Sequence, residues 1–135
     1  ETYFLKNDNT TTITFIGVTK DGVLIYPDLL KVKVALDNGE IVGFDAYQYL
    51  MSHRKRDIPK PKLTEEEARK KVSPRIKVER VKLAIIPMPG NKEQLCYEFK
   101  GKYNNFDYFV YINAEDGSEE NILRIIKDEN GTLTQ

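Results

Sequence analysis

Alternating hydrophobic and polar residues dominate the first third of the chain and predict β-strands. The expected strands are residues 3–5, 12–16, 30–36 and 40–49. Turn signals separate them at residues 6–10 and 20–22. Tyr26-Pro27-Asp28 predicts a bend before the third strand. Ile13 and Phe15 are in phase on one strand face, as are Val42 and Phe44 on another.

The pattern breaks over residues 53–62, where Pro59 and Pro61 interrupt a run rich in basic residues. Proline cannot donate a backbone hydrogen bond, so neither a helix nor a central strand is expected here. This segment is predicted to be a linker.

Residues 63–72 carry the signals of a helix. Thr64 is a good N-cap, and Glu67 three residues later completes a capping box. Ser73-Pro74 ends the helix. So short a helix is marginal alone, so we expect it to pack on a sheet face.

Period-two alternation resumes after the helix and predicts further strands. They cover residues 81–85, 95–99, 106–112 and 122–126. Tyr97 and Phe99 are expected to face the core, and the alternate residues Cys96, Glu98 and Lys100 to face outward. The next strand is expected to point Phe106, Tyr108, Val110 and Ile112 inward. The polar end, residues 129–132, is expected to fray.

One hairpin pattern occurs twice, at an offset of 78 residues. The matched pairs are Val32 with Val110, Val34 with Ile112, and Gly39 with Gly117.

The repeat divides the chain into four predicted parts. They are a strand-only partial unit at 1–52, the linker at 53–62, a complete unit at 63–127 and a polar tail at 128–135. The predicted class is α+β. The first unit lacks a helix, which would expose apolar side chains of its sheet and offer a route to self-association. Repeats of this kind bind or scaffold more often than they catalyse.

Charge and cysteine content exclude several classes of protein. Lys plus Arg and Asp plus Glu both number 21, so a general nucleic-acid or membrane-surface binder is not expected. The single cysteine, Cys96, excludes an intrachain disulfide. The sequence has no run long enough to span a membrane and no signal peptide. It begins with Glu1 rather than Met, so we expect a fragment whose membrane anchor would lie outside it.

Catalytic and metal-binding sets are weakly supported. Cys96 and His53 are the only conceivable nucleophile and base, and they fall on different predicted elements. We interpret Cys96 as a structural, semi-exposed thiol. Residues 65–67 are three glutamates in one helix turn, where capping explains them better than a glycosidase pair facing across a cleft. No metal and no cofactor are predicted.

A basic cluster in the linker is the best candidate binding site. It consists of His53, Arg54, Lys55, Arg56, Lys60 and Lys62. The cluster could dock an acidic partner surface, or contact anionic lipid or a glycan. It could equally be a solvated linker.

Several segments of the second unit resemble the PepSY domain family. These are Glu66-Glu67-Ala68-Arg69, Leu95 to Phe99, Phe109 to Ala114, and Asp116-Gly117. Three longer runs are similar to the C-terminal region of a family of spore-germination proteins that contain this domain. These runs are residues 37–44, 55–68 and 96–103, and the resemblance covers essentially the whole chain.

The resemblance implies tandem PepSY units, each a cystatin-like antiparallel sheet of three to four strands with one helix on a face. It implies a non-enzymatic protein of endospore-forming bacteria that stabilises or regulates a SleB-like cortex-lytic enzyme needed in germination. The expected location is outside the spore inner membrane, near the cortex, with a membrane segment that this chain lacks. The alternative implied by the family is a propeptide-like inhibitor of a peptidase or cell-wall hydrolase. The family supplies no catalytic residues.

Overall fold

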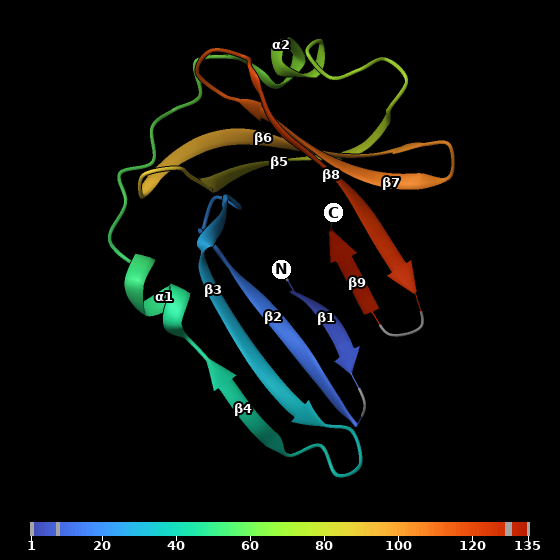
Figure 1. Ribbon diagram of the computed structural model, residues 1–135. Coiled ribbons are helices and arrows are strands. Elements are labelled where there is room, and N and C mark those ends of the chain that lie inside the picture. The colour runs from blue at the N-terminus through green and yellow to red at the C-terminus, as the bar shows by residue number, and fades with distance from the viewer. Residues whose placement is uncertain (1, 8, 129–130, 135) are drawn as a thin grey trace.

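The computed structural model describes residues 2–7, 9–128 and 131–134. In this part of the chain, nine strands and two short helices form an α+β fold, as predicted (Figure 1). The strands are β1 (Thr2–Asn7), β2 (Thr10–Val18), β3 (Leu24–Ala35), β4 (Ile41–Asp45), β5 (Lys77–Met88), β6 (Lys92–Tyr103), β7 (Phe106–Asn113), β8 (Glu119–Asp128) and β9 (Gly131–Thr134). The helices are α1 (Tyr47–Ser52) and α2 (Glu65–Arg69).

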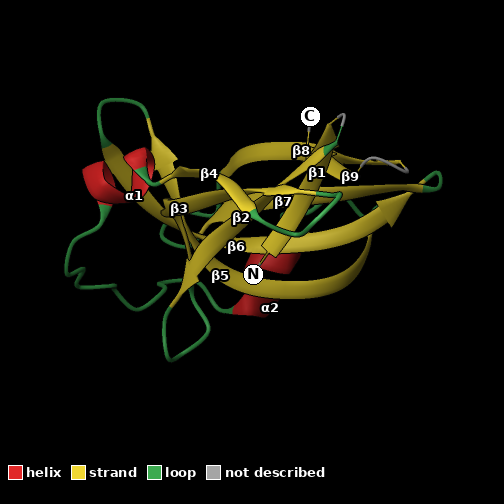
Figure 2. Cartoon of the chain, turned by 90° about the horizontal axis from the view of Figure 1, so that it is seen from below, coloured by secondary structure: helices red, strands yellow, loops and turns green. Residues whose placement is uncertain are grey.

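The strands form two antiparallel meanders that are joined at both sides. We call β1–β4 the first sheet and β5–β9 the second sheet. On one side β3 pairs in parallel with β5, at Leu24 with Ala84 and at Ile25 with Ile85. On the other side β1 meets β9. Figures 1 and 2 show the second sheet lying across the ends of the first.

Strand β3 begins six residues before the predicted start at Leu30. Its register against β2 jumps, because Ile16 pairs with Leu29 whereas Gly17 pairs with Ile25. Residues 26–28 therefore form a bulge inside the strand rather than a bend before it. A bulge is one of the few places in a sheet that accept proline, which explains Pro27.

The prediction of a strand through residue 49 is wrong beyond Asp45, because helix α1 follows there. The Asp45 side chain accepts a hydrogen bond of 3.0 Å from the Tyr47 backbone N–H, which turns the chain out of the strand. Strand β4 itself is exposed, with Ile41, Val42 and Phe44 all open to solvent. The expected exposure of apolar side chains on the first sheet is therefore present.

Helix α2 has the capping box that the sequence predicts. The Glu67 backbone N–H donates to Thr64 Oγ1 at 3.2 Å, and the Thr64 N–H donates to Glu67 Oε2 at 2.8 Å. The regular helix ends at Arg69, earlier than predicted. The chain tightens there, since the Lys71 and Val72 N–H groups each donate to a carbonyl three residues back.

One face of the second sheet packs under α2. Ala68 and Val72 reach down to Phe99, Val110 and Ile112, and all five are buried. The inward prediction for Tyr97, Phe99, Val110 and Ile112 is confirmed. Phe106 lies at the start of β7 and is 47% exposed, so its inward prediction is wrong.

The opposite face of the second sheet packs against the first sheet. Ile16 and Leu24 contact a cluster that includes Cys96 and Tyr111. Cys96 and Glu98 were predicted to face outward, yet both are fully buried. The second sheet is therefore buried on both faces, by α2 on one side and by the first sheet on the other. Alternation within one strand predicts only one buried face, so it could not show that the first sheet packs on the other.

The C-terminal end is also more ordered than predicted. Strand β9 pairs with β8 over four residues: at one end Gly131 lies opposite Asp128, and at the other Thr134 lies opposite Ile125. The prediction of fraying is therefore wrong for residues 131–132, whereas residues 129–130 lie outside the described part.

Candidate functional site

The linker between Ser52 and Leu63 runs along one outer side of the molecule without regular secondary structure (Figure 1). It passes both sheets on its way from α1 to α2, and side chains from both sheets meet it. Its basic residues can therefore be placed one by one.

Arg56 lies at the centre of the linker and is largely buried, with a side chain 9% exposed. Its guanidinium donates to both oxygens of Asp28 in β3, at 3.0 and 3.1 Å. It also donates to both oxygens of Glu93 in β6, at 2.9 and 3.0 Å, and to the Ser52 carbonyl at 2.8 Å. Hydrogen bonds to Glu93 and then to Asp28 raise the pKa of Arg56, against the opposing effect of burial. Arg56 thus connects the two sheets through charge-assisted, bidentate contacts.

His53 and Arg54 reinforce the same junction. His53 Nδ1 lies 2.8 Å from Asp28 Oδ2, and the ring stacks on Tyr49 of α1 at 4.4 Å between centroids. Arg54 Nη2 lies 3.2 Å from Glu93 Oε2, although its side chain remains 57% exposed. Three of the six predicted site residues therefore converge on Asp28 and Glu93.

The three lysines do not join this cluster. Lys62 Nζ forms an exposed ion pair of 2.8 Å with Glu115, the kind that contributes little to stability. Lys55 and Lys60 are exposed, and neither has an ion pair within the described part of the chain.

Sequence reasoning missed the two carboxylates that hold the linker, Asp28 and Glu93. Asp28 lies in a bulge whose register cannot be read from alternation, and Glu93 lies near the start of a hairpin strand. The one available signal was the excess of cations in the linker, because buried charges require partners. That argument predicts that carboxylates exist but not which ones.

A second polar cluster, also missed, bridges the sheets. Glu98 of β6 is fully buried and accepts hydrogen bonds from the hydroxyls of Tyr26 in β3 and Tyr111 in β7, the latter at 2.8 Å. Arg80 of β5 donates to the other Glu98 oxygen at 2.9 Å. Burial, followed by the nearby charge of Glu98, raises the pKa of the Tyr26 hydroxyl, which stays protonated as a donor. Glu98 and Tyr111 are buried between the sheets, whereas the Arg80 side chain is 32% exposed, so the cluster joins the two sheets and reaches the surface at Arg80.

Cys96 has the environment of a core residue. It is fully buried, so the expectation of a semi-exposed thiol is wrong. Burial raises the pKa of its thiol from 9.0 to about 12. A nucleophilic cysteine reacts as the thiolate, so this environment opposes catalysis.

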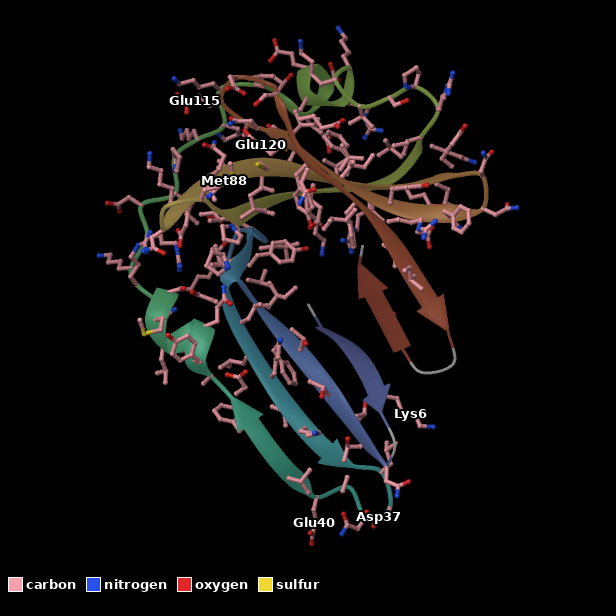
Figure 3. All side chains as sticks on the ribbon, viewed as in Figure 1. Lys6, Asp37, Glu40, Met88, Glu115 and Glu120 are labelled. Carbon is pink, nitrogen blue, oxygen red and sulfur yellow. The ribbon has the colours of Figure 1, made fainter. Side chains whose placement is uncertain are left out.

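Among the described residues, whose side chains are drawn in Figure 3, the acidic ones show no arrangement that resembles a metal site. Of residues 65–67, Glu67 caps its own helix. Within the described residues, no group of three or more His, Cys, Asp or Glu side chains could hold a metal ion. No helix in that same part of the chain is both long enough and apolar enough to cross a bilayer.

Two family models match consecutive parts of the chain. Residues 1–59 match the model described as YpeB sporulation, PepSY1 and PepSY2 domains. Residues 62–123 match the PepSY model, described as peptidase propeptide and YPEB domain.

Curated relatives carry the same name. The sporulation protein YpeB of Halalkalibacterium halodurans is 46% identical over 110 residues, which is 82% of this chain and 25% of that protein. The sporulation protein YpeB of Bacillus subtilis is 43% identical over 130 residues, which is 93% of this chain and 29% of that protein. The chain therefore spans about a quarter of the length of the curated relatives it matches.

A solved structure agrees with both comparisons. The Bacillus megaterium YpeB C-terminal domain superposes with a TM-score of 0.83 at 41% identity, over 93% of this chain and 57% of that one. The matched models, the sequence identity and the shared fold lead to one conclusion: this chain belongs to the PepSY-domain family and resembles the C-terminal PepSY region of the sporulation protein YpeB.

Proposed function

We propose that this chain is a non-catalytic interaction module with a role in sporulation, and that it stabilises or regulates a SleB-like cortex-lytic enzyme. The observation that carries the proposal is 41–46% identity to proteins named sporulation protein YpeB over 82–93% of the chain. The site chemistry supports it, because the thiol is buried and the polar clusters hold the two sheets together. The proposed location is outside the spore inner membrane.

A rigid two-sheet body suits a binding role. Interfaces between repeats within one chain are often mobile unless large contacts or specific bonds fix them. Arg56 and Glu98 supply such bonds here, so surfaces on both sheets keep a fixed relation. Preorganised surfaces bind at lower entropic cost.

The candidate partner-binding residues divide into two groups. His53, Arg54 and Arg56 contact carboxylates of this chain, so their first role is to position the linker. Lys55 and Lys60 are exposed with no carboxylate partner among the described residues, and Lys62 has only an exposed ion pair with Glu115, so these three can meet an acidic partner.

The test is the amount of hydrolase in dormant spores of a strain that lacks the coding region for residues 1–135. We expect the hydrolase, measured by immunoblot, to fall several-fold, and to return when the region is restored. Unchanged hydrolase in the deletion strain would contradict the proposal.

A second function is favoured by one observation: the family that matches residues 62–123 is described as peptidase propeptide and YPEB domain, so it includes propeptides of peptidases. In that case the chain would inhibit its partner directly. Purified chain added to a cortex-lytic enzyme should slow digestion of cortex fragments in proportion to occupancy. Normal digestion rates with a saturated complex would eliminate inhibition and leave stabilisation.

A further inference from the structure

The turn between β3 and β4 contains an Asn-Gly step in an open setting. Residues 36–42 are all exposed, and Asn38 precedes Gly39, whose backbone has a left-handed φ of 74°. Among the described residues, no atom beyond the chain neighbours lies within 4 Å of where a Gly39 Cβ would be. Figure 3 shows Asp37 and Glu40 at this turn, at the end of the first sheet that lies away from the second sheet. The Asn38–Gly39 peptide is therefore open to water.

The side chain of Asn38 is folded over the peptide that follows it. Its Oδ1 accepts a hydrogen bond of 3.0 Å from the Glu40 backbone N–H, which closes an Asx turn. The ring closed by this bond contains the Gly39 nitrogen, so Asn38 Cγ is held near that nitrogen. The Glu40 N–H also points at the oxygen on which negative charge develops when Cγ is attacked. A glycine has no Cβ to shield its nitrogen, so the attacking atom is accessible.

We propose that this open turn makes Asn38 a site of spontaneous deamidation through a cyclic succinimide. The Gly39 nitrogen loses its proton to a solvent base and attacks Asn38 Cγ. A bond forms between these two atoms, the bond from Cγ to the side-chain nitrogen breaks, and that nitrogen takes up a proton and leaves as ammonia. Water then adds to either carbonyl carbon of the ring and opens it to aspartate or isoaspartate. The sum is one water consumed and one ammonia released. The inference concerns the chain alone and does not depend on the proposed function.

The matched hairpin shows that the turn accepts the aspartate product. Asp116 stands at the position equivalent to Asn38, and its Oδ1 accepts a hydrogen bond of 2.8 Å from the Ser118 N–H. Hydrogen bonds from the Ser118 side chain and backbone hold the pKa of Asp116 below its usual value. An ionised carboxylate is a poor electrophile, so an aspartate in this turn resists renewed ring closure.

The isoaspartate product does not fit the turn. It routes the main chain through Cβ and Cγ of the former Asn38, which adds one backbone atom between β3 and β4. Among the described strands, β4 pairs with β3 alone, and its register already shifts between Lys33 and Val34. Register in a hairpin is set by the length of the turn, so we expect isoaspartate to release β4 from β3.

The second turn offers a matched control within the same chain. Gly117 is buried, and the place where its Cβ would be lies 3.1 Å from Leu63 Cδ2 and 3.3 Å from Lys71 Cε. These contacts resist the backbone rotation that ring closure requires. Asp116→Asn therefore places the same Asn-Gly step in a covered turn.

The first test incubates the whole chain, unmodified and with Asp116→Asn, in mildly alkaline buffer. Peptide mapping by mass spectrometry follows the loss of each amide over time. We expect the amide of Asn38 to be lost at least about tenfold faster than that of Asn121, which is exposed and not followed by glycine. It should also be lost at least about fivefold faster than the amide at position 116 of the variant. The chain has a further Asn-Gly step, Asn130-Gly131, whose peptide is assigned separately.

Either of two results would overturn the proposal. Equal rates at Asn38 and Asn121 in the unmodified chain would show that the turn does not promote the reaction. Equal rates at position 38 and position 116, in a variant whose melting curve matches the unmodified chain, would show that the open setting has no part in it.

The second test concerns the isoaspartate product. The isoaspartyl chain is separated by ion exchange, and its control is Asn38→Asp, which carries the same charge without the extra backbone atom. Hydrogen exchange at the amides bonded between β3 and β4 should be at least about tenfold faster in the isoaspartyl chain than in the control. Equal exchange in the two chains would overturn the release of β4.

Discussion

The two matched hairpins share their geometry but not their surroundings. In the first, the Gly39 N–H donates to the Ala35 carbonyl at 2.9 Å, and in the second the Gly117 N–H donates to the Asn113 carbonyl at the same distance. Both glycines have a left-handed backbone, with φ of 74° and 78°. Yet Ala114 is 1% exposed, whereas Leu36, its counterpart, is 46% exposed.

The difference comes from a segment outside the hairpin. Next to Gly117, Leu63 and Lys71 from the two ends of the α2 region lie within van der Waals distance of where a Cβ would be, whereas nothing lies so close to Gly39. The Lys62 and Leu63 N–H groups also donate to the Ala114 carbonyl. Local sequence thus specifies the turn, and a distant helix specifies the burial.

The largest expected effect comes from removing the link between the two sheets. Arg56→Met leaves Asp28 and Glu93 without their shared cation in a largely dry site. The free energy of unfolding should fall by about 3 kcal/mol, the usual cost of breaking a buried ion pair. Urea denaturation measures it, and hydrogen exchange should show β2 and β3 losing protection before β6 and β7 do.

The neighbouring residue supplies the control for Arg56. Lys55→Met removes an exposed cation of the same linker that has no carboxylate partner among the described residues. Its effect should stay within about 0.5 kcal/mol. Equal effects of the two substitutions would mean that Arg56 does not join the sheets.

The second test sets the two hairpins directly against each other. Val110→Ala opens a cavity under α2, where Val110 is fully buried, and should cost about 2 kcal/mol. Val32→Ala changes the equivalent, half-buried position and should cost less than about 1 kcal/mol. Equal costs in chemical denaturation would show that α2 does not determine the difference.

These hairpins also show how far sequence reasoning reached. Alternation and turn chemistry predicted both strands and both turns, because these depend on neighbouring residues. The capping box likewise predicted the start of α2. Burial failed at Cys96 and Glu98, since the first sheet covers that face through contacts remote in sequence.

The location of the candidate site could be predicted from the sequence, but its internal contacts could not, because they too depend on residues remote in sequence. The charge excess located the linker, but its pairing with Asp28 and Glu93 depends on a bulge and on the packing of two sheets. Helix α1 was missed, although the spacing of Tyr47, Leu50 and Met51 carried a helical signal. A continuing strand was the simpler interpretation of the hairpin, and Asp45 ends it by a local side-chain bond.

The ionisation of Cys96 can be used to test whether the interface between the two sheets excludes water. Its thiol has a raised pKa in the folded chain, so the unfolded chain ionises first as pH rises. The contribution of the Cys96 thiol to the free energy of unfolding is fully present below pH 9.0, and it is lost as the pH rises from 9.0 to about 12. The free energy of unfolding of the natural chain should therefore fall more steeply above pH 9.0 than that of Cys96→Ala, by at most about 1.4 kcal/mol per pH unit. Parallel slopes would mean that the thiol is already open to water.

The smallest expected difference is between the two turn glycines. Alanine at either position must adopt a positive φ, so Gly39→Ala and Gly117→Ala should each cost about 1 kcal/mol. At Gly117 the new Cβ would also lie 3.1 Å from Leu63 Cδ2 and 3.3 Å from Lys71 Cε, which adds about 0.5 kcal/mol of crowding. Adding Leu63→Ala should remove part of that excess, and a double-mutant cycle measures the coupling. A coupling energy of zero would mean that Leu63 moves away from the new Cβ without cost. The turn at Gly117, next to α2, would then be no more constrained than the exposed turn at Gly39.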